Sequence, residues 1–368
     1  MTWLAYFIIF FTALRLLVAL SNFFLRRWLR KGLLLNEPMV SVLIPARNEE
    51  KNIGRIVNDL INHDYNNLEI IVYDDLSEDN TYQIVHQFAI KNDKVKVIKG
   101  EFLPEGWLGK NHACHRLALQ AEGDYLLFLD ADVIIKKGLV KNALAHLRKY
   151  QLSLLSIFPV QIMKSFSERL AVPLMNWILV SLLPLIFTRI SSWPSFSAAN
   201  GQFMLFDAGV YHKETFHKVL KSHKVEDIAI FRLMKKKGYK VETLLGNNSI
   251  RCRMYQTWDE AVKGFSKNVF EFFGGSRVLA YLFGLLTTFG FLVVLLALPL
   301  IFTLLYFLMV ILLRIIISLA SRQNVFLNLL LAPLQQINFL IIMAIALVLQ
   351  NKKATLWKGR NIDVETKI

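Results

Sequence analysis

The sequence is poor in cysteine and in acidic residues. Cys114 and Cys252 are the two cysteines among 368 residues. They form no CxxC pair and no disulfide framework, which excludes a disulfide-stapled scaffold and fits a reducing compartment. Asp and Glu number 28 against 43 Lys and Arg, so the formal net charge is +15. Because apolar segments accompany this charge, we expect anionic lipid headgroups, and not nucleic acid, to be the partner.

Charge is absent from two long stretches near the C-terminus. No charged residue lies from Val278 to Leu313, or from Asn324 to Gln350. Each stretch exceeds the roughly 20 residues that one helical membrane crossing requires. Pro299 divides the first stretch and is compatible either with a hairpin of two crossings or with a kink. We therefore expect C-terminal membrane segments within residues 276–350, in a number that the sequence leaves open.

The N-terminus has a further apolar run. Residues 3–20 carry only Arg15 as a charge, and a basic cluster follows at residues 26–31. A secretory signal would have the reverse order, with its positive charge before the apolar run. The positive-inside rule places the residues after the run in the cytoplasm. We expect residues 1–24 to be an uncleaved transmembrane anchor with its N-terminus outside.

A fourth apolar stretch, Leu170–Phe187, is interrupted by Pro173 and Pro184. A single crossing there would separate two acidic motifs that the chemistry below needs together. We therefore expect an interfacial helix near residues 168–190, with a buried core helix as the alternative.

The tail, residues 351–368, begins with lysines and is expected in the cytoplasm. An even number of crossings must then lie between Gly275 and Asn351. We expect either that Val278–Leu313 crosses once or that part of it is interfacial, with Arg314 snorkelling toward the headgroups.

The middle of the chain, residues 36–275, alternates strand-like and helix-like segments. Strands are expected at residues 39–45, 68–73, 95–98 and 125–129, with helical patterns after each of the first two. This alternation predicts an α/β fold with a mostly parallel sheet. Ligands bind such sheets beyond the carboxyl ends of the strands, which is where Arg47, Asp75, Asp130 and Asp132 fall.

Asp130 and Asp132 are two residues apart at the end of a strand, and so their side chains lie on the same side. A divalent cation with oxygen ligands, such as Mg²⁺ or Mn²⁺, would stabilise the pair and hold substrate phosphates. A solvated turn is the alternative reading. The nearby Asp75 favours the cation.

Three segments carry a family resemblance: VSVLIPARNEEKNI from Val40, EIIVYDDLSEDNT at 69–81, and GDYLLFLDADV at 123–133. Together they resemble family 2 glycosyltransferases with the GT-A, Rossmann-like fold. The resemblance implies an inverting hexosyltransferase that uses a nucleotide-diphosphate sugar, most commonly UDP-glucose. It implies that four residues of the first segment lie against the nucleotide and that Asp75 contacts the base. It also implies that Asp130 contacts the ribose or the sugar, and that Asp132 binds the metal ion together with Asp130. The four residues are Pro45, Ala46, Arg47 and Glu49.

Two further positions fit this chemistry. Lys110 would add positive charge near the diphosphate or pair with a nucleotide-site carboxylate, with a plain surface lysine as the alternative. Inversion needs a general base for the acceptor hydroxyl. The resemblance points to Asp227, beside Glu226, although an acidic helix start also complements the helix dipole.

Three weaker segments, at residues 109–118, 253–268 and 356–360, resemble bacterial membrane enzymes that glycosylate carotenoids and related polyisoprenoid lipids. The Gln-x-x-Arg-Trp motif of processive synthases is missing, which favours transfer of one sugar to a lipid hydroxyl or carboxyl. The alternatives are transfer to a polyprenyl phosphate, and an inactive membrane-docked protein that binds lipid or nucleotide. We expect a multi-pass plasma-membrane protein with a cytoplasmic catalytic domain.

Overall fold

The computed structural model describes residues 1–25, 27–352 and 356–363. The chain forms two compact units. Unit 1 comprises residues 1–27, 161–187 and 254–355, and unit 2 comprises residues 28–160, 188–253 and 356–368. The predicted domain, 36–275, is thus divided between them. Arg26 of the predicted basic cluster, and residues 353–355 and 364–368 of the predicted tail, lie outside the described residues.

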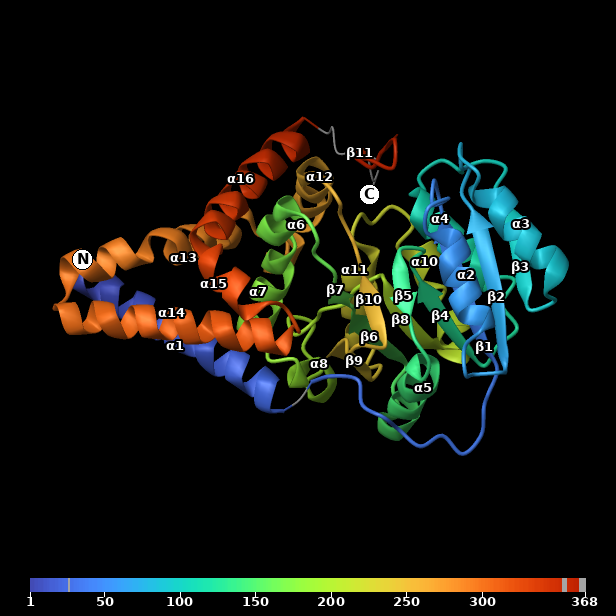
Figure 1. Cartoon of the computed structure of the whole chain (residues 1–368), viewed down its shortest axis with the longest axis horizontal. Coiled ribbons are helices and arrows are strands. Elements are labelled where there is room, and N and C mark those ends of the chain that lie inside the picture. The colour runs from blue at the N-terminus through green and yellow to red at the C-terminus, as the bar shows by residue number, and fades with distance from the viewer. Residues whose placement is uncertain (26, 353–355, 364–368) are drawn as a thin grey trace. The chain divides into compact units, whose positions relative to one another are not determined.

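Unit 2 is built on a seven-stranded sheet in the order β3-β2-β1-β4-β8-β6-β9 (Figure 1). The first four strands run parallel, as the sequence predicts. They are β1 (Val40–Ala46), β2 (Leu68–Asp74), β3 (Val95–Lys99) and β4 (Tyr125–Leu129). β8 (Phe203–Asp207) is antiparallel to both β4 and β6 (Leu154–Phe158), and β9 (Val241–Leu245) runs parallel to β6.

Both faces of this sheet are buried, which explains the continuous apolar runs of its strands. In β1, Val42 and Ile44 enter one core cluster, whereas Leu43 enters the cluster on the other face. The first cluster is closed by α2 (Ile53–Ile61) and α5 (Leu139–Tyr150), and the second by α4 (Gly109–Ala118) and α11 (Glu226–Lys236). The sheet is therefore held rigidly between two helical layers.

The remaining elements of unit 2 are short. They are α3 (Thr81–Lys91), β5 (Val133–Ile135), α9 (Ala208–Glu214), α10 (Phe216–Val219), β10 (Ile250–Cys252), β11 (Leu356–Trp357) and β12 (Arg360–Asn361). β5 pairs with β10, and β11 pairs with β12 in a small C-terminal hairpin. β7 (Val160–Gln161) and α8 (Ile186–Ile190) lie where the chain passes between the units.

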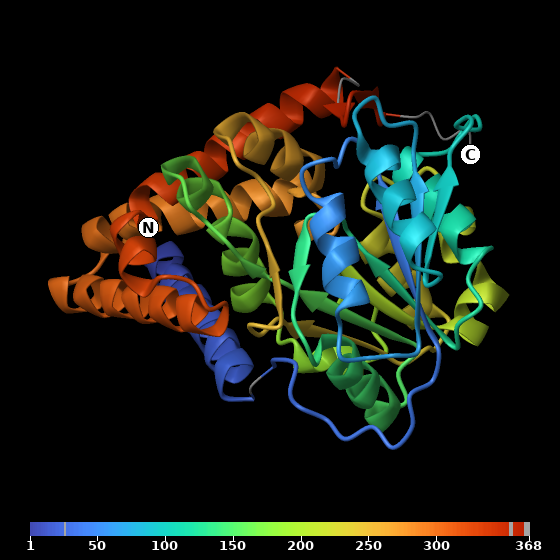
Figure 2. The ribbon, with the colours of Figure 1, turned by 45° about the vertical axis from the view of Figure 1, so that its right-hand side comes forward.

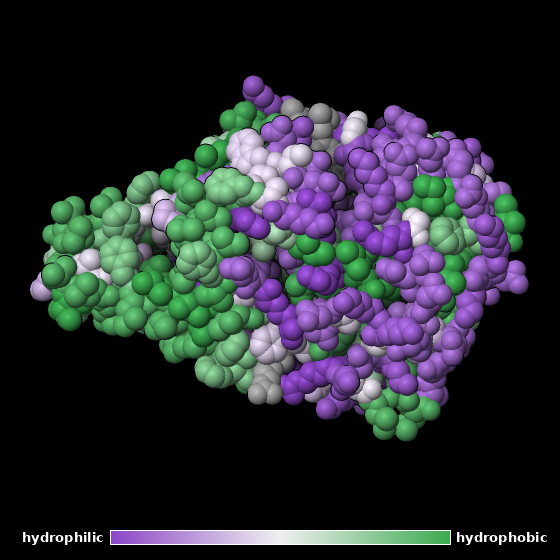
Figure 3. Space-filling view, in the orientation of Figure 1, coloured by the Kyte–Doolittle hydropathy of each residue, from purple (hydrophilic) through white to green (hydrophobic). Residues whose placement is uncertain are grey.

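Unit 1 contains helices that are long and apolar enough to cross a membrane. Within the described residues they are α1 (Thr2–Phe24), α13 (Arg277–Ala297), α14 (Leu300–Ala320) and α16 (Ala332–Asn351). The surface over α13 and α14 is largely hydrophobic, as expected for contact with lipid (Figure 3). The helix is interrupted at Leu298 and Pro299, so the stretch Val278–Leu313 forms parts of two helices. The number of times that this stretch crosses a membrane stays a prediction.

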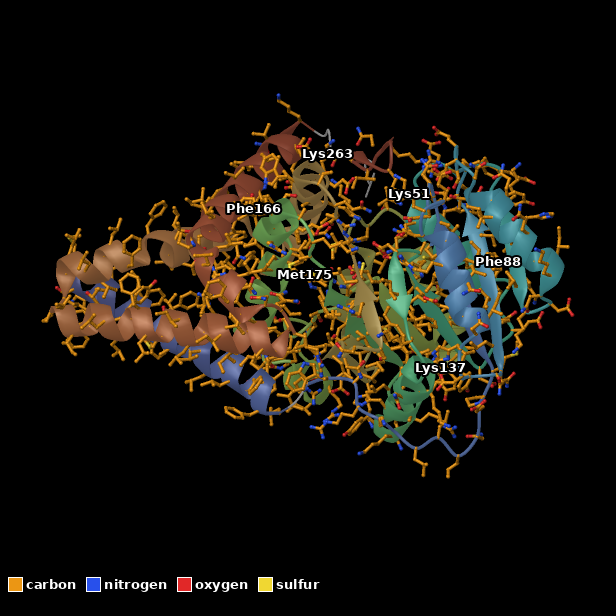
Figure 4. All side chains as sticks on the ribbon, in the orientation of Figure 1. Lys51, Phe88, Lys137, Phe166, Met175 and Lys263 are labelled. Carbon is orange, nitrogen blue, oxygen red and sulfur yellow. The ribbon has the colours of Figure 1, made fainter. Side chains whose placement is uncertain are left out.

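The stretch Leu170–Phe187 forms three short helices because its prolines interrupt it. α6 (Phe166–Ala171) precedes Pro173, α7 (Pro173–Leu182) begins there, and α8 follows Pro184. α7, which carries Met175 (Figure 4), is buried along most of its length in unit 1, as the core-helix alternative requires. Its position at a bilayer surface stays a prediction. Unit 1 also contains α12 (Trp258–Asn268), η1 (Glu271–Phe273) and α15 (Val325–Leu330).

Candidate active site

The parallel strands lie side by side in one sheet (Figure 2), and the predicted polar residues lie at or just after their carboxyl ends. Pro45 and Ala46 end β1, Asp75 directly follows β2, and Asp130 directly follows β4. The Ala46 carbonyl accepts a 2.7 Å hydrogen bond from the Asp75 amide, which ties the ends of the first two strands together. The strand ends that carry these residues are therefore neighbours in the sheet, as the sequence predicts.

Lys110, near the start of α4, joins two acidic positions that are far apart in the sequence. Its Nζ lies 2.9 Å from Asp130 Oδ1 and 3.3 Å from Glu226 Oε1. Burial by itself would lower the pKa of Lys110, but the Asp130 and Glu226 carboxylates outweigh it and raise that pKa above its usual value. Lys110 is thus paired with a site carboxylate, and the plain surface lysine is excluded.

Asp227 is held beside this ion-pair cluster by backbone donors. The Gly201 amide donates to Asp227 Oδ2 at 2.8 Å, and the Ile228 amide donates to Oδ1 at 2.8 Å. Burial and the adjacent Glu226 raise the pKa of Asp227 to about 6. A carboxylate with such a pKa is ionised at neutral pH and is basic enough to receive a proton.

Asp132 lies in a region of concentrated negative charge. Burial, together with the Asp130 and Glu49 carboxylates, raises the pKa of Asp132 to about 7. Its Oδ1 atom is buried and has no hydrogen-bond partner among the described atoms. A buried acceptor in this condition is expensive unless a further group satisfies it.

These features fit a divalent cation. No cluster of three or more His, Cys, Asp or Glu side chains that could hold a metal occurs in the described part of the chain. Mg²⁺ typically takes only one or two protein carboxylates and completes its shell with water and substrate phosphates. Asp132, through its unpartnered Oδ1, and Asp130 would be the donors for such an ion.

Asp75 has a partner that the sequence did not predict. Arg360 Nη1, from the C-terminal hairpin, lies 2.6 Å from Asp75 Oδ2. Burial raises the pKa of Asp75, although Arg360 and Arg47 oppose this effect. Arg47 Nη1 donates to the carbonyls of Asp75 and Leu76, at 2.8 and 2.6 Å. Arg47 therefore shapes the loop after β2.

The same hairpin reaches Glu49. Lys358 Nζ forms an ion pair with Glu49 and also donates to the Arg47 carbonyl at 3.0 Å. Sequence reasoning noted residues 356–360 only as a subfamily signal and assigned them no role. Lys358 and Arg360 lie 309 and 285 positions from Glu49 and Asp75 in the sequence. Their positive charges were the one sign in the sequence that this segment could contact acidic residues.

The mixed α/β sheet has the GT-A arrangement, and comparisons with known proteins indicate the class of protein. The model of the family described as Glycosyl transferase family 2 matches residues 41–171, which hold β1 to β4 and both strand-end aspartates. This match covers about a third of the chain, which there resembles the family, and the relatives support a glycosyltransferase.

Particular relatives are more distant. The chain is 27% identical to the 4,4'-diaponeurosporenoate glycosyltransferase of Staphylococcus aureus over 267 residues, which cover 69% of this chain and 68% of that protein. The mannosyltransferase PcManGT from Pyrobaculum calidifontis, solved with GDP-Man and Mn2+, aligns over 94% of this chain and 99% of its own, with a TM-score of 0.54 and 16% identity. S. aureus TarS 1–349 aligns over 63% of this chain and 65% of its own, with a TM-score of 0.41 and 22% identity. This chain thus spans somewhat less than two thirds of that structure.

Proposed function

We propose that the protein moves one sugar from a nucleotide-diphosphate sugar, most simply UDP-glucose, to a hydroxyl or carboxyl of a membrane lipid such as a carotenoid. The main observation in support is that Lys110 forms ion pairs with Asp130 and with Glu226. It thereby connects the strand-end pair Asp130/Asp132 with the pair Glu226/Asp227. A donor diphosphate and an acceptor group would meet between these pairs. The relationship to the S. aureus carotenoid enzyme supports the lipid acceptor.

The residues have distinct roles in this proposal. Asp75 and Arg47 would face the nucleoside, with Pro45, Ala46 and Glu49 beside it. Lys110 would hold Asp130 in place through their ion pair and add positive charge near the leaving diphosphate. A Mg²⁺ or Mn²⁺ ion held by Asp132 and Asp130 would stabilise the charge that develops on that leaving group.

Asp227 would remove the acceptor proton. Its two backbone hydrogen bonds fix the carboxylate, and each oxygen keeps a further lone pair for the acceptor hydroxyl. Glu226 stays paired with Lys110 and raises the basicity of Asp227. A carboxylic acid acceptor is already ionised at neutral pH and would need little help from Asp227.

Arg360 and Lys358 are the further donor-site residues in this proposal. Arg360 pairs with the carboxylate that would receive the base, so nucleotide binding has to break or lengthen that contact. The guanidinium would then be free to contact the phosphates, which are its natural bidentate partners.

The direct test compares lipid extracts of cells with and without the gene by mass spectrometry. The proposal expects a lipid that gains the mass of one hexose only when the intact gene is present. An unchanged lipid profile, together with no transfer from UDP-glucose or other nucleotide-sugars by the purified protein, would refute it. A polyprenyl phosphate carrying the sugar would favour the alternative acceptor instead.

We also propose a topology with the catalytic residues in the cytoplasm. In unit 1, Arg277 at the start of α13 donates to Asn351 Oδ1 at 3.1 Å, while Arg314 in the second half of α14 donates to Gln335 at 2.6 Å. The end of α16 thus lies near the start of α13, and the start of α16 lies near the second half of α14. A hairpin of α13 and α14 would place the start of α13 and the end of α14 on the same side of the membrane. Two crossings by α13 and α14, with α16 at the surface, give the even number expected.

Cysteine labelling tests this topology. Both natural cysteines are buried, so they are suitable as a silent background. Pro299→Cys should react with an impermeant thiol reagent in intact cells, whereas Lys352→Cys should react only after permeabilisation. Reaction of Lys352→Cys in intact cells would contradict an even number of crossings.

A further inference from the structure

Two arginines are buried inside unit 1, on helices of membrane-spanning length. Arg15 of α1 is 4% exposed and Arg314 of α14 is 5% exposed. The guanidinium group stays protonated in proteins, so both positions carry full positive charge. A charge at such a position is costly and is usually paired or functional. Because Arg314 is buried, its side chain does not snorkel toward the headgroups, whereas the sequence predicts that it does.

The partners of the two arginines are neutral. Arg15 Nε and Nη2 both donate to Ser181 Oγ, at 3.3 and 3.0 Å. Arg314 Nη1 donates to Gln335 Oε1 at 2.6 Å. Neither arginine forms an ion pair with any residue in the described part of the chain.

Both positive charges lie against one aromatic ring. The Cζ atoms of Arg15 and Arg314 are 4.6 and 5.1 Å from the centroid of Trp177, on α7. Cation–π contacts stabilise each guanidinium by a modest amount. They do not remove the repulsion between two like charges held near the same ring in apolar surroundings.

The neutral side chains nearby have little capacity left. Gln335 Nε2 donates to the Arg169 carbonyl at 2.9 Å and to Asn328 Oδ1 at 3.3 Å, and Asn328 Nδ2 donates to Ser318 Oγ at 3.0 Å. A guanidinium has five N–H donors, of which Arg15 uses two on a single hydroxyl oxygen and Arg314 uses one. Most donors of both groups therefore remain for an acceptor, and a negatively charged one would also offset the two charges.

We propose that Arg15 and Arg314 together bind the oxyanion of a membrane lipid, a phosphate or a carboxylate. Guanidinium groups bind both oxyanions with paired, charge-assisted hydrogen bonds. The ligand is a lipid because the helices that carry these arginines expose large apolar side chains, among them Leu14, Leu17, Leu304 and Leu308. This site is separate from the acidic donor site and does not require the proposed transferase activity.

Native mass spectrometry of the full-length protein in detergent tests the proposal without any nucleotide-sugar. The delipidated protein is titrated with phosphatidylglycerol, oleate and phosphatidylcholine in separate arms. The first two carry a net negative charge and the third does not. We expect one tightly held anionic lipid, with at least about tenfold preference over phosphatidylcholine. Preference for phosphatidylglycerol identifies a bilayer headgroup as the source, and preference for oleate identifies an acidic lipid end group.

The variant Arg15→Gln/Arg314→Gln should lose that preference, whereas Arg277→Gln should keep it. Arg277 is an exposed arginine of the same unit and donates hydrogen bonds to Asn351 and Gln350. Equal binding by the double variant and the wild type would overturn the proposal. If the double variant does not fold, a competition experiment on the wild-type protein replaces it. The proposal is overturned if neither phosphatidylglycerol nor oleate displaces phosphatidylcholine.

Discussion

The two units handle buried charge in opposite ways. In unit 2, Lys110 is placed between Asp130 and Glu226, and Arg360 faces Asp75. In unit 1, Arg15 and Arg314 form hydrogen bonds and cation–π contacts with neutral hydroxyl, amide and aromatic groups of the described residues. Charges of both signs within a few ångströms suit a ligand that brings a diphosphate together with a metal ion. A pair of like charges suits a ligand of the opposite sign alone.

The two units also differ in the sign of the charge that is in excess. Unit 2 has an excess of carboxylates around Asp132, where burial and neighbouring acids raise the pKa to about 7. Unit 1 has an excess of cations. These two charge distributions are the basis of our proposals of a cation for unit 2 and an anion for unit 1.

The largest effect should come from Asp227→Asn. This change keeps the size of the side chain and removes the base, so the rate of transfer to a hydroxyl should fall by roughly 10²–10⁴-fold. Nucleotide binding should change little, because Asp227 is assigned to the acceptor. Steady-state transfer assays and nucleotide titrations on the same preparation check both points. Asp259→Asn, an exposed position at the start of α12, is the matched control. A rate near that of the wild type would instead favour an acceptor that is already ionised.

Arg360→Gln should have an intermediate effect on stability. It leaves the Asp75 carboxylate buried without its cation, and the free energy of unfolding should fall by about 1–3 kcal/mol. Thermal or denaturant unfolding without nucleotide measures the loss. Arg116→Gln removes an exposed arginine of α4 and should have no comparable effect. Equal stability of both variants would show that the hairpin contact contributes nothing in solution.

A smaller effect is expected in the pH dependence of stability. The folded-state pKa values of Asp132 and Asp227, about 7 and about 6, lie above those of an unfolded chain. The folded protein therefore binds more protons than the unfolded protein between about pH 4 and pH 7. The stabilisation from these groups is complete below pH 4 and is lost as the pH rises through 6 and 7. Unfolding midpoints measured in chelator should show this decline, and Mg²⁺ should reduce it by stabilising the ionised carboxylates. A decline that Asp132→Asn leaves unchanged would argue against Asp132 as its source.

Much of unit 2 could be predicted because its signals are local. The apolar run of β1, the spacing of Ile53, Ile56 and Leu60, and the acids after β2 and β4 each follow from a few neighbouring residues. The contact of Lys110 with a carboxylate was predicted only as one of three readings, since it depends on how α4 packs against the sheet. The role of Arg360 depends on a contact across most of the chain, and no local pattern encodes it.

Unit 1 was harder to predict for a related reason. Hydropathy locates apolar helices but does not distinguish a helix that faces lipid from one that is enclosed by others, such as α7. Pro299 marked the break between α13 and α14, yet proline is compatible with both a kink and a hairpin. Arg15 and Arg314 come to lie against the same Trp177 ring only because three helices from distant parts of the sequence pack together.

The central claim is that unit 2 binds a nucleotide-sugar through a cation on Asp132 and Asp130. Isothermal titration of the purified protein with UDP and with GDP, in Mn²⁺ and in chelator, tests it most directly. One of the nucleotides should bind in Mn²⁺, and chelation or Asp132→Asn should weaken binding at least about tenfold, or about 1.4 kcal/mol. Asp93→Asn, an exposed acid, should bind as the wild type does. Binding that is equally tight in chelator and in Asp132→Asn, or no nucleotide binding by the folded wild type in Mn²⁺, would contradict the claim.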